Sequence, residues 1–159
     1  MLLILTSYKE PENKKSMSSP APDGYSTVCP YLIVESVEQQ MEFLHEVFGA
    51  EIKESLKNEE GIIMHGEVKI ADTVIMMGRG SVGFSPHPAM NYVYVQDVNL
   101  VYKKAIQSGA ISIYEPADRF YGVREAGFKD MHNNTWYAAQ YVKDVSIEDM
   151  EKGFAKKKA

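Results

Sequence analysis

Apolar residues recur along the chain in an order that predicts a strand, an amphipathic helix and further strands. The first copy opens with an almost wholly apolar run at 29–34. A helix face follows at helical spacing, formed by Val37, Met41, Leu44 and Phe48. Ser36, with Gln39 three residues later, matches a helix-capping pattern, and Gly49 can supply the left-handed residue that ends a helix. We therefore predict a strand, a helix and a new strand that begins at residue 50.

The same pattern returns after about 60 residues, a spacing too long for one solenoid unit. Residues 91–95 form the strand, Asp97 is the helix cap, and Val98, Val101 and Ala105 form the buried helix face. Two copies are too few for a repeat array. The sequence therefore predicts one domain made of two modules, related by pseudo-two-fold symmetry.

The rest of the first module alternates in the manner of strands. Apolar-rich runs at 61–70 and 73–78 are separated by Ala71-Asp72, a two-residue hairpin candidate. In the first of these runs His65 and Glu67 point to the same face, because side chains alternate along a strand. Residues 78–88, rich in Gly, Ser and Pro, are expected to link the modules.

The second module is expected to continue with a short strand at 111–114, a turn at 115–118, an extended run at 119–129 and a last strand at 136–142. Between the last two lies turn material in which Asn tolerates left-handed backbone. Ser146 with Asp149 resembles a capping box, which predicts a C-terminal helix at 146–155.

Composition narrows the class of protein. The chain has 159 residues, of which 45% are hydrophobic, so one domain with a real core is expected. A net charge of -5 disfavours a nucleic-acid surface. The single cysteine is compatible with a cytoplasmic protein, and no apolar run is long enough to span a membrane. Residues 1–24 are expected to form a flexible tail, and residues 25–155 a single domain with modules at 28–79 and 90–143.

Five short motifs, by their order and spacing, resemble the vicinal oxygen chelate superfamily, which includes glyoxalase I, extradiol dioxygenases and fosfomycin- and bleomycin-resistance proteins. They are most similar to its glyoxalase-like group known as PhnB-like. The motifs are Pro30-Tyr31-Leu32, Phe48-Gly49-Ala50, Met64-His65-Gly66-Glu67, Phe120-Tyr121-Gly122 and Asp144-Val145-Ser146. The resemblance covers about residues 28–152.

The resemblance implies an α+β fold of two tandem βαβββ modules that form a cupped mixed sheet, with the ligand in the cup and the C-terminal helix as an addition. Metal-dependent members take four ligands from the first and last strands of the modules. Those positions here match Cys29, Met76, Met90 and Tyr137. Thioethers, a thiol and a phenol suit hard or borderline divalent ions poorly, so no metal cofactor is predicted.

An aromatic set would line the cup if its side chains face inward, and Tyr and Trp suit a flat or amphipathic ligand. Its members are Tyr31, Tyr92, Tyr94, Tyr121, Trp136 and Tyr137. Alternation makes Tyr92, Tyr94 and Tyr137 inward if Cys29 and Met90 are inward. Core packing is the alternative role for part of the set.

His65 and Glu67 are the candidate catalytic pair, since two such groups on one strand face could act as acid and base or hold a metal. The alternative is a polar pair at a sheet edge or an interface.

Three functions remain open. The first is a glyoxalase/bleomycin-resistance-like protein that binds a small organic molecule in an aromatic cup without the usual metal. The second is a metal-dependent lyase, transferase or dioxygenase that uses His65, Glu67 and an acidic residue such as Glu125. The third is a scaffold whose own side chains fill the cup. A homodimer is expected, because an open cup leaves sheet edges that need cover.

Overall fold

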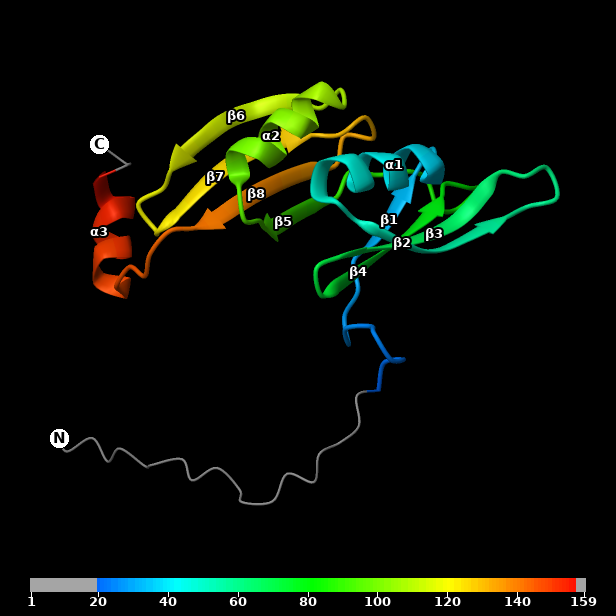
Figure 1. The fold of residues 1–159 in the computed structure, drawn as a ribbon, viewed down its shortest axis with the longest axis horizontal. Coiled ribbons are helices and arrows are strands. Elements are labelled where there is room, and N and C mark those ends of the chain that lie inside the picture. The colour runs from blue at the N-terminus through cyan, green and yellow to red at the C-terminus, as the bar shows by residue number, and fades with distance from the viewer. Residues whose placement is uncertain (1–19, 157–159) are drawn as a thin grey trace, which may run out of the picture.

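The computed structural model describes residues 20–156 and contains two modules of the same topology (Figure 1). The first module consists of β1 (Tyr31–Val34), α1 (Val37–Phe48), β2 (Glu51–Lys57), β3 (Ile63–Ile70) and β4 (Thr73–Arg79). The second consists of β5 (Met90–Tyr94), α2 (Val98–Gln107), β6 (Ile111–Asp118), β7 (Val123–Lys129) and β8 (Thr135–Tyr141), followed by α3 (Ile147–Lys156). Most of the predicted tail, residues 1–19, lies outside the described part of the chain.

Each module folds into its own four-stranded mixed sheet. The strand orders are β1-β4-β3-β2 and β5-β8-β7-β6, and in each the first two strands are parallel. The crossover helix between the first and second strands covers one face, because its apolar stripe must be buried. The predicted α+β fold with two βαβββ modules and a C-terminal helix is confirmed. The other face of each sheet carries no helix of its own module, and we call it the open face.

The helix ends follow from the local sequence signals. Ser36 accepts a hydrogen bond from the Gln39 amide at 3.3 Å, and Gly49 has φ 68° at the end of α1. Asp97 caps α2 by accepting from the Asn99 and Leu100 amides at 2.9 and 3.0 Å. These capped ends fix where each chain segment leaves its helix and enters the next strand.

The turn predicted at 115–118 is wrong, because β6 continues through it to Asp118. The register of β6 against β7 shifts on both sides of Tyr114, and the chain turns only after Asp118. Pro116 is tolerated here because β6 is the edge strand of its sheet, where a missing backbone N–H leaves no second neighbour unpaired. Tyr114 on this strand lies over the open face, next to Gly127 and Tyr137.

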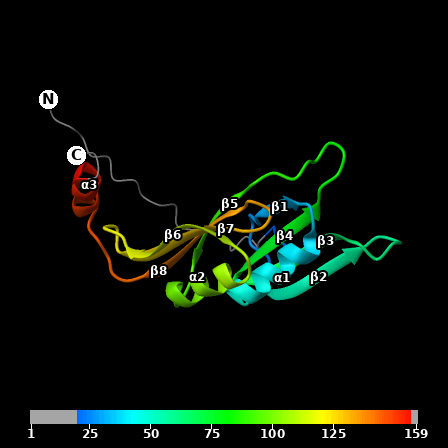
Figure 2. The same cartoon turned by 90° about the horizontal axis from the view of Figure 1, so that it is seen from above.

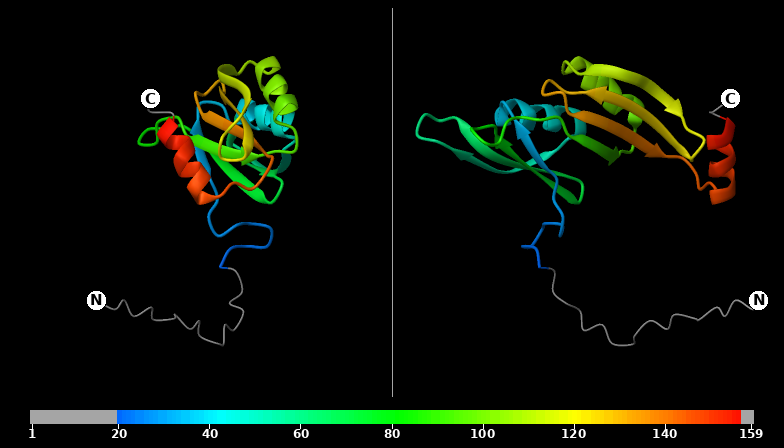
Figure 3. Two further views of the ribbon diagram at one scale, coloured as in Figure 1. Left: turned by 90° about the vertical axis from the view of Figure 1, so that its left-hand side faces the viewer. Right: turned by 180° about the vertical axis from the view of Figure 1, so that it is seen from behind.

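The modules join through their helices and a shared aromatic core. α1 and α2 pack side by side, and Phe48 lies 5.3 Å from Trp136 between ring centroids (Figure 2). The buried Asn134 amide donates to Gln40 Oε1 at 3.2 Å, which adds a polar link between the modules. α3 stands at the far end of the second sheet, away from the first module (Figure 3). No helix within residues 20–156 is long and apolar enough to cross a membrane.

Candidate functional site

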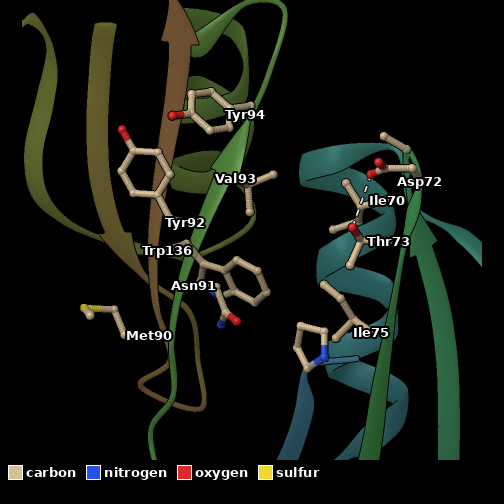
Figure 4. A pocket seen from close by; sticks show the side chains of 12 residues that line it. Ile70, Asp72, Thr73, Ile75, Met90, Asn91, Tyr92, Val93, Tyr94 and Trp136 are labelled. Atoms are coloured by element: carbon tan, nitrogen blue, oxygen red, sulfur yellow. Dashed lines mark hydrogen bonds between the residues drawn. The ribbon is translucent and has the colours of Figure 1, made fainter. Parts of the chain in front are cut away.

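The open face of the second sheet carries a cluster of tyrosines. Along β5, Tyr92 and Tyr94 alternate with Asn91 and Val93, and their side chains point to the opposite side of the strand from Val93 (Figure 4). Tyr137 on β8 pairs in register with Tyr92. Ring centroids lie 5.4 Å apart for Tyr92 and Tyr94 and 6.4 Å apart for Tyr92 and Tyr137. We call this surface, with Tyr114 and Tyr121, the tyrosine face.

A buried carboxylate ties these rings together. Glu125 on β7 is 5% exposed and accepts hydrogen bonds from three tyrosine hydroxyls. Tyr92 donates at 2.7 Å, Tyr114 at 2.6 Å and Tyr121 at 3.1 Å. Buried carboxylates are tolerated when they are saturated with hydrogen bonds. The ring positions are therefore set by one acceptor rather than by loose packing.

The tyrosines stay protonated in this cluster. Burial raises the pKa of Tyr92, Tyr114 and Tyr121, and the neighbouring Glu125 charge and hydrogen bonds raise it further. A hydroxyl with a raised pKa donates to the carboxylate throughout the neutral range. The tyrosine hydroxyls thus remain donors through the neutral range.

Arg119 supplies the opposite charge at the edge of the tyrosine face. Its guanidinium lies 4.3 Å from the Tyr114 ring centroid, and its Nε lies 3.6 Å from Glu125 Oε1. Tyr114 in turn stacks on Tyr137 at 6.0 Å between centroids, with planes 15° apart. Gly127 lies under this stack, since an added Cβ there would come within 3.0 Å of Tyr114 and 3.1 Å of Tyr137.

The structure brings together four of the six predicted aromatic ligand residues, namely Tyr92, Tyr94, Tyr121 and Tyr137. Tyr31 lies on β1, on the open face of the other sheet, where it contacts His65. Trp136 is 0% exposed and packs under the second sheet against Phe48, so its expected place among the cup tyrosines is corrected. Neighbours on a strand face opposite sides, so Trp136 cannot share the tyrosine face with Tyr137.

Tyr114 and Arg119 were not predicted from the sequence, and Glu125 was predicted only as an acidic residue that a metal-dependent enzyme could use. The signal for Glu125 was an acidic residue in a run that is otherwise apolar or small from Val123 to Phe128, apart from Arg124. A carboxylate at a buried strand position needs donors, and the surrounding tyrosines are the available ones.

A second polar cluster occupies the open face of the first sheet. His65 Nε2 lies 3.3 Å from Glu67 Oε1, and the Tyr31 hydroxyl lies 3.2 Å from His65 Nδ1. Tyr25, which precedes β1, also donates to Glu67. The histidine side chain is 25% exposed and the glutamate 8%, so the carboxylate is held inside and the imidazole is reachable.

The pKa of Glu67 reflects these partners. Burial alone would raise it, but the hydrogen bonds from Tyr25 and His65 outweigh burial and lower the pKa below its usual value. The hydrogen bond between Tyr25 and Glu67 also raises the pKa of Tyr25 to about 12. Glu67 is therefore ionised at neutral pH and can orient the His65 ring, as carboxylates do in acid/base pairs.

The positions that correspond to the usual metal ligands are split between the modules. Cys29 and Met76 lie in the first, where the Cys29 thiol contacts the Ser26 carbonyl at 3.4 Å. Met90 and Tyr137 lie on the open face of the second. Within residues 20–156, no three His, Cys, Asp or Glu side chains come together in a way that could hold a metal ion.

Comparison with known proteins gives a likeness in fold. No family model matches the sequence, and no curated protein matches it. Among solved structures, TioX from Micromonospora sp. ML1 is similar with a TM-score of 0.61 and 19% identity, covering 70% of this chain and 95% of that one. A glyoxalase/bleomycin resistance protein/dioxygenase family enzyme from Burkholderia phytofirmans PsJN has a TM-score of 0.61 and 17% identity, covering 75% and 98%.

The fosfomycin resistance protein FosX from Listeria monocytogenes is also similar, with a TM-score of 0.55, 20% identity and coverage of 77% of this chain and 94% of that one. A mutant of FosX was solved in complex with Mn(II) and 1S,2S-dihydroxypropylphosphonic acid. At these identities the likeness establishes the fold. The chain thus has the glyoxalase/bleomycin resistance/dioxygenase fold, in agreement with the resemblance found in the sequence.

Proposed function

We propose that this chain, which has the glyoxalase/bleomycin resistance/dioxygenase fold, binds a small organic molecule on its tyrosine face. The observation that supports this most is the hydrogen bonding of three tyrosine hydroxyls to the buried Glu125. Rings held in this way lose little freedom when a ligand arrives, and such preorganisation favours binding.

The exposure of the rings supports a binding role over core packing. Tyr92 is 46% exposed and Tyr94 67%, although both belong to a sheet whose other face packs against α2. Exposed aromatic groups in a contiguous patch are typical of binding surfaces. Because the hydroxyls of Tyr92, Tyr114 and Tyr121 already donate to Glu125, the rings offer mainly their apolar faces. A flat, largely apolar molecule is the ligand class that fits.

We propose further that no divalent metal takes part. The corresponding positions offer one thiol, two thioethers and one phenol, a donor set that does not fit a hard or borderline divalent ion. Glyoxalase chemistry, which needs a Lewis acid to stabilise an enediolate, is accordingly not expected.

A second copy of the chain is the partner that we propose for the open faces. Besides the tyrosines, Val28 is 80% and Met90 74% exposed, which leaves apolar side chains on both modules in contact with water. A homodimer that covers these side chains would close the cup over the tyrosine face. We also propose a reducing compartment such as the cytoplasm, with which the single cysteine is in keeping. The proposed membership of the PhnB-like group rests on the sequence motifs.

Calorimetric titration with coumarin, a flat and neutral bicyclic molecule, tests the binding proposal. Saturable binding that weakens at least tenfold in Tyr137→Ala is expected, because this ring lies at the centre of the tyrosine face. The control is Tyr141→Ala, since Tyr141 is at the end of β8 and outside the cluster. Equal affinity for coumarin in both variants and the parent would count against the tyrosine face.

An enzyme that uses His65 and Glu67 is the second candidate, supported by the Tyr31, His65 and Glu67 contacts on the first open face. Under it, His65 and Glu67 would hold a divalent metal or exchange protons with a substrate. Metal analysis of the purified protein tests this candidate. One zinc, nickel or manganese ion per chain that is lost in His65→Ala would favour the enzyme over the metal-free binding protein.

A further inference from the structure

A cleft with a volume of about 370 Å³ lies between the two modules, and it borders the tyrosine face along β5. Pro30, Ile70 and Ile75 line it from the first module. Asn91, Val93 and Trp136 line it from the second, together with Met90, Tyr92 and Tyr94 (Figure 4). Its volume is at the lower end of the range of about 300–1,000 Å³ for small-molecule pockets. It therefore has room for a compact ligand.

The side chains that line the cleft are mainly apolar and carry little charge. Asp72 carries the one carboxylate among the described lining residues, and it is exposed. The Thr73 hydroxyl donates to Asp72 Oδ1 at 3.2 Å, so these two polar groups satisfy each other. No Lys, Arg or His of the described chain lines the cleft. An anion would find no countercharge, so a neutral ligand is favoured.

Asn91 supplies the polar feature of the cleft. Its Nδ2 atom is buried and has no hydrogen-bond partner, although buried amide donors are nearly always paired. In Figure 4 the Asn91 side chain projects from β5 toward the side where Ile75 lies. A ligand acceptor that reaches this amide would satisfy it, and leaving a buried donor unpaired is costly.

We propose that the cleft is a second ligand site, which takes a compact neutral molecule with an apolar body and one carbonyl-type acceptor. The apolar body packs between Ile75 and Val93, and the acceptor receives a hydrogen bond from the Asn91 amide. Tyr92 and Tyr94 also border the cleft, but their rings point to the other side of β5 (Figure 4), so the proposed contacts come from Asn91 and Val93.

Trp136 makes this site directly observable. It is the only tryptophan of the chain, so its indole N–H gives a single, self-assigned signal in a ¹⁵N-correlated NMR spectrum. Titration with cyclohexanone and with methylenecyclohexane compares two molecules of nearly the same shape, of which only the ketone carries an acceptor. Both should shift the indole signal in a saturable way. The ketone should bind roughly threefold to tenfold more tightly, as expected for one buried hydrogen bond.

Two variants assign the effect to the cleft. Asn91→Leu should abolish the preference for the ketone while methylenecyclohexane still binds, and Ile75→Phe should block both molecules by filling the cleft. Tyr141→Phe, at the exposed end of β8 and outside the residues that line the cleft, is the control and should bind both molecules as the parent does. Equal affinities of the parent protein for the two molecules would overturn the role of Asn91. Indole shifts that persist unchanged in Ile75→Phe would overturn the site itself. The comparison of the two molecules in the parent protein does not depend on whether either variant folds.

Discussion

Tyr92 donates a hydrogen bond to Glu125 Oε2 at 2.7 Å, which ties a ring on the edge strand β5 to a carboxylate two strands away on β7. The bond crosses β8, whose Tyr137 ring lies next to Tyr92. Through this one contact the exposed edge of the sheet and its buried centre are held in a fixed geometry. The proposed ligand site depends on that geometry.

Replacing the carboxylate should loosen the tyrosine face. Glu125→Gln keeps the shape but removes the charge that three hydroxyls share, so each hydrogen bond weakens. Because hydrogen bonds to charged groups are the stronger kind, we expect unfolding free energy to fall by about 1–3 kcal/mol. Coumarin affinity should fall with it. Urea unfolding measures the first effect, and Glu115→Gln on the exposed side of β6 is the control that should change neither.

Gly127 gives a test that leaves every hydrogen-bonding group in place. The methyl group of Gly127→Ala would meet the Tyr114 and Tyr137 rings at 3.0 and 3.1 Å, which is closer than about nine in ten real contacts of this kind. The stacked pair must shift, so we expect weaker coumarin binding with a melting temperature lowered by only a few degrees, from about 1 kcal/mol of overpacking. Unchanged coumarin affinity would mean that the stack is not part of the site.

Most of the fold could be predicted from local signals. The helix ends follow from Ser36 and Asp97, which cap the starts of α1 and α2, and from Gly49, which ends α1. The predicted two-residue hairpin is also present, and Ala71 adopts φ 52° in it. The segment around Pro116 was wrongly predicted as a turn, because a proline is compatible with a strand only where that strand lies at a sheet edge. The order of strands in a sheet depends on the tertiary structure. Sequence order alone does not reveal which strand becomes an edge.

The site was predictable only in part. Alternation correctly grouped Tyr92 and Tyr94 on one strand face, and the same rule should have separated Trp136 from Tyr137. Alternation fixes relative faces but not which face is covered by a helix. The role of Glu125 depends on hydroxyls from three different segments, and such convergence is visible only after the chain has folded.

The lowered pKa of Glu67 makes stability depend on pH. The pKa of Glu67 is lower in the folded protein than its ordinary value of 4.5, so the ionised carboxylate contributes its full stabilisation at pH values above 4.5. This stabilisation is lost as the pH falls through the pKa that Glu67 has in the folded protein. The difference in unfolding free energy between the parent and Glu67→Gln should therefore shrink between pH 6 and pH 3. Urea unfolding at several pH values measures it, with Glu59→Gln as an exposed control. A difference that stays constant over this range would contradict the assigned cause.

A dimer should form through the open faces. Size-exclusion chromatography with light scattering is expected to show twice the chain mass at micromolar concentration. Met90→Glu should shift the protein toward monomer, because it places a charge among the exposed apolar residues proposed to be covered. Glu35→Gln, a surface change away from these residues, should not. A parent protein that stays monomeric at all micromolar concentrations would refute the dimer.

The most direct test of the tyrosine face is NMR of protein with ¹³C-labelled tyrosine rings during coumarin titration. We predict saturable shifts of the Tyr92, Tyr94 and Tyr137 ring signals with one common dissociation constant, while the signal of Tyr102, on α2, stays unchanged. Ring signals of the three tyrosines that do not move while coumarin binds elsewhere, or that move no more than that of Tyr102, would contradict it.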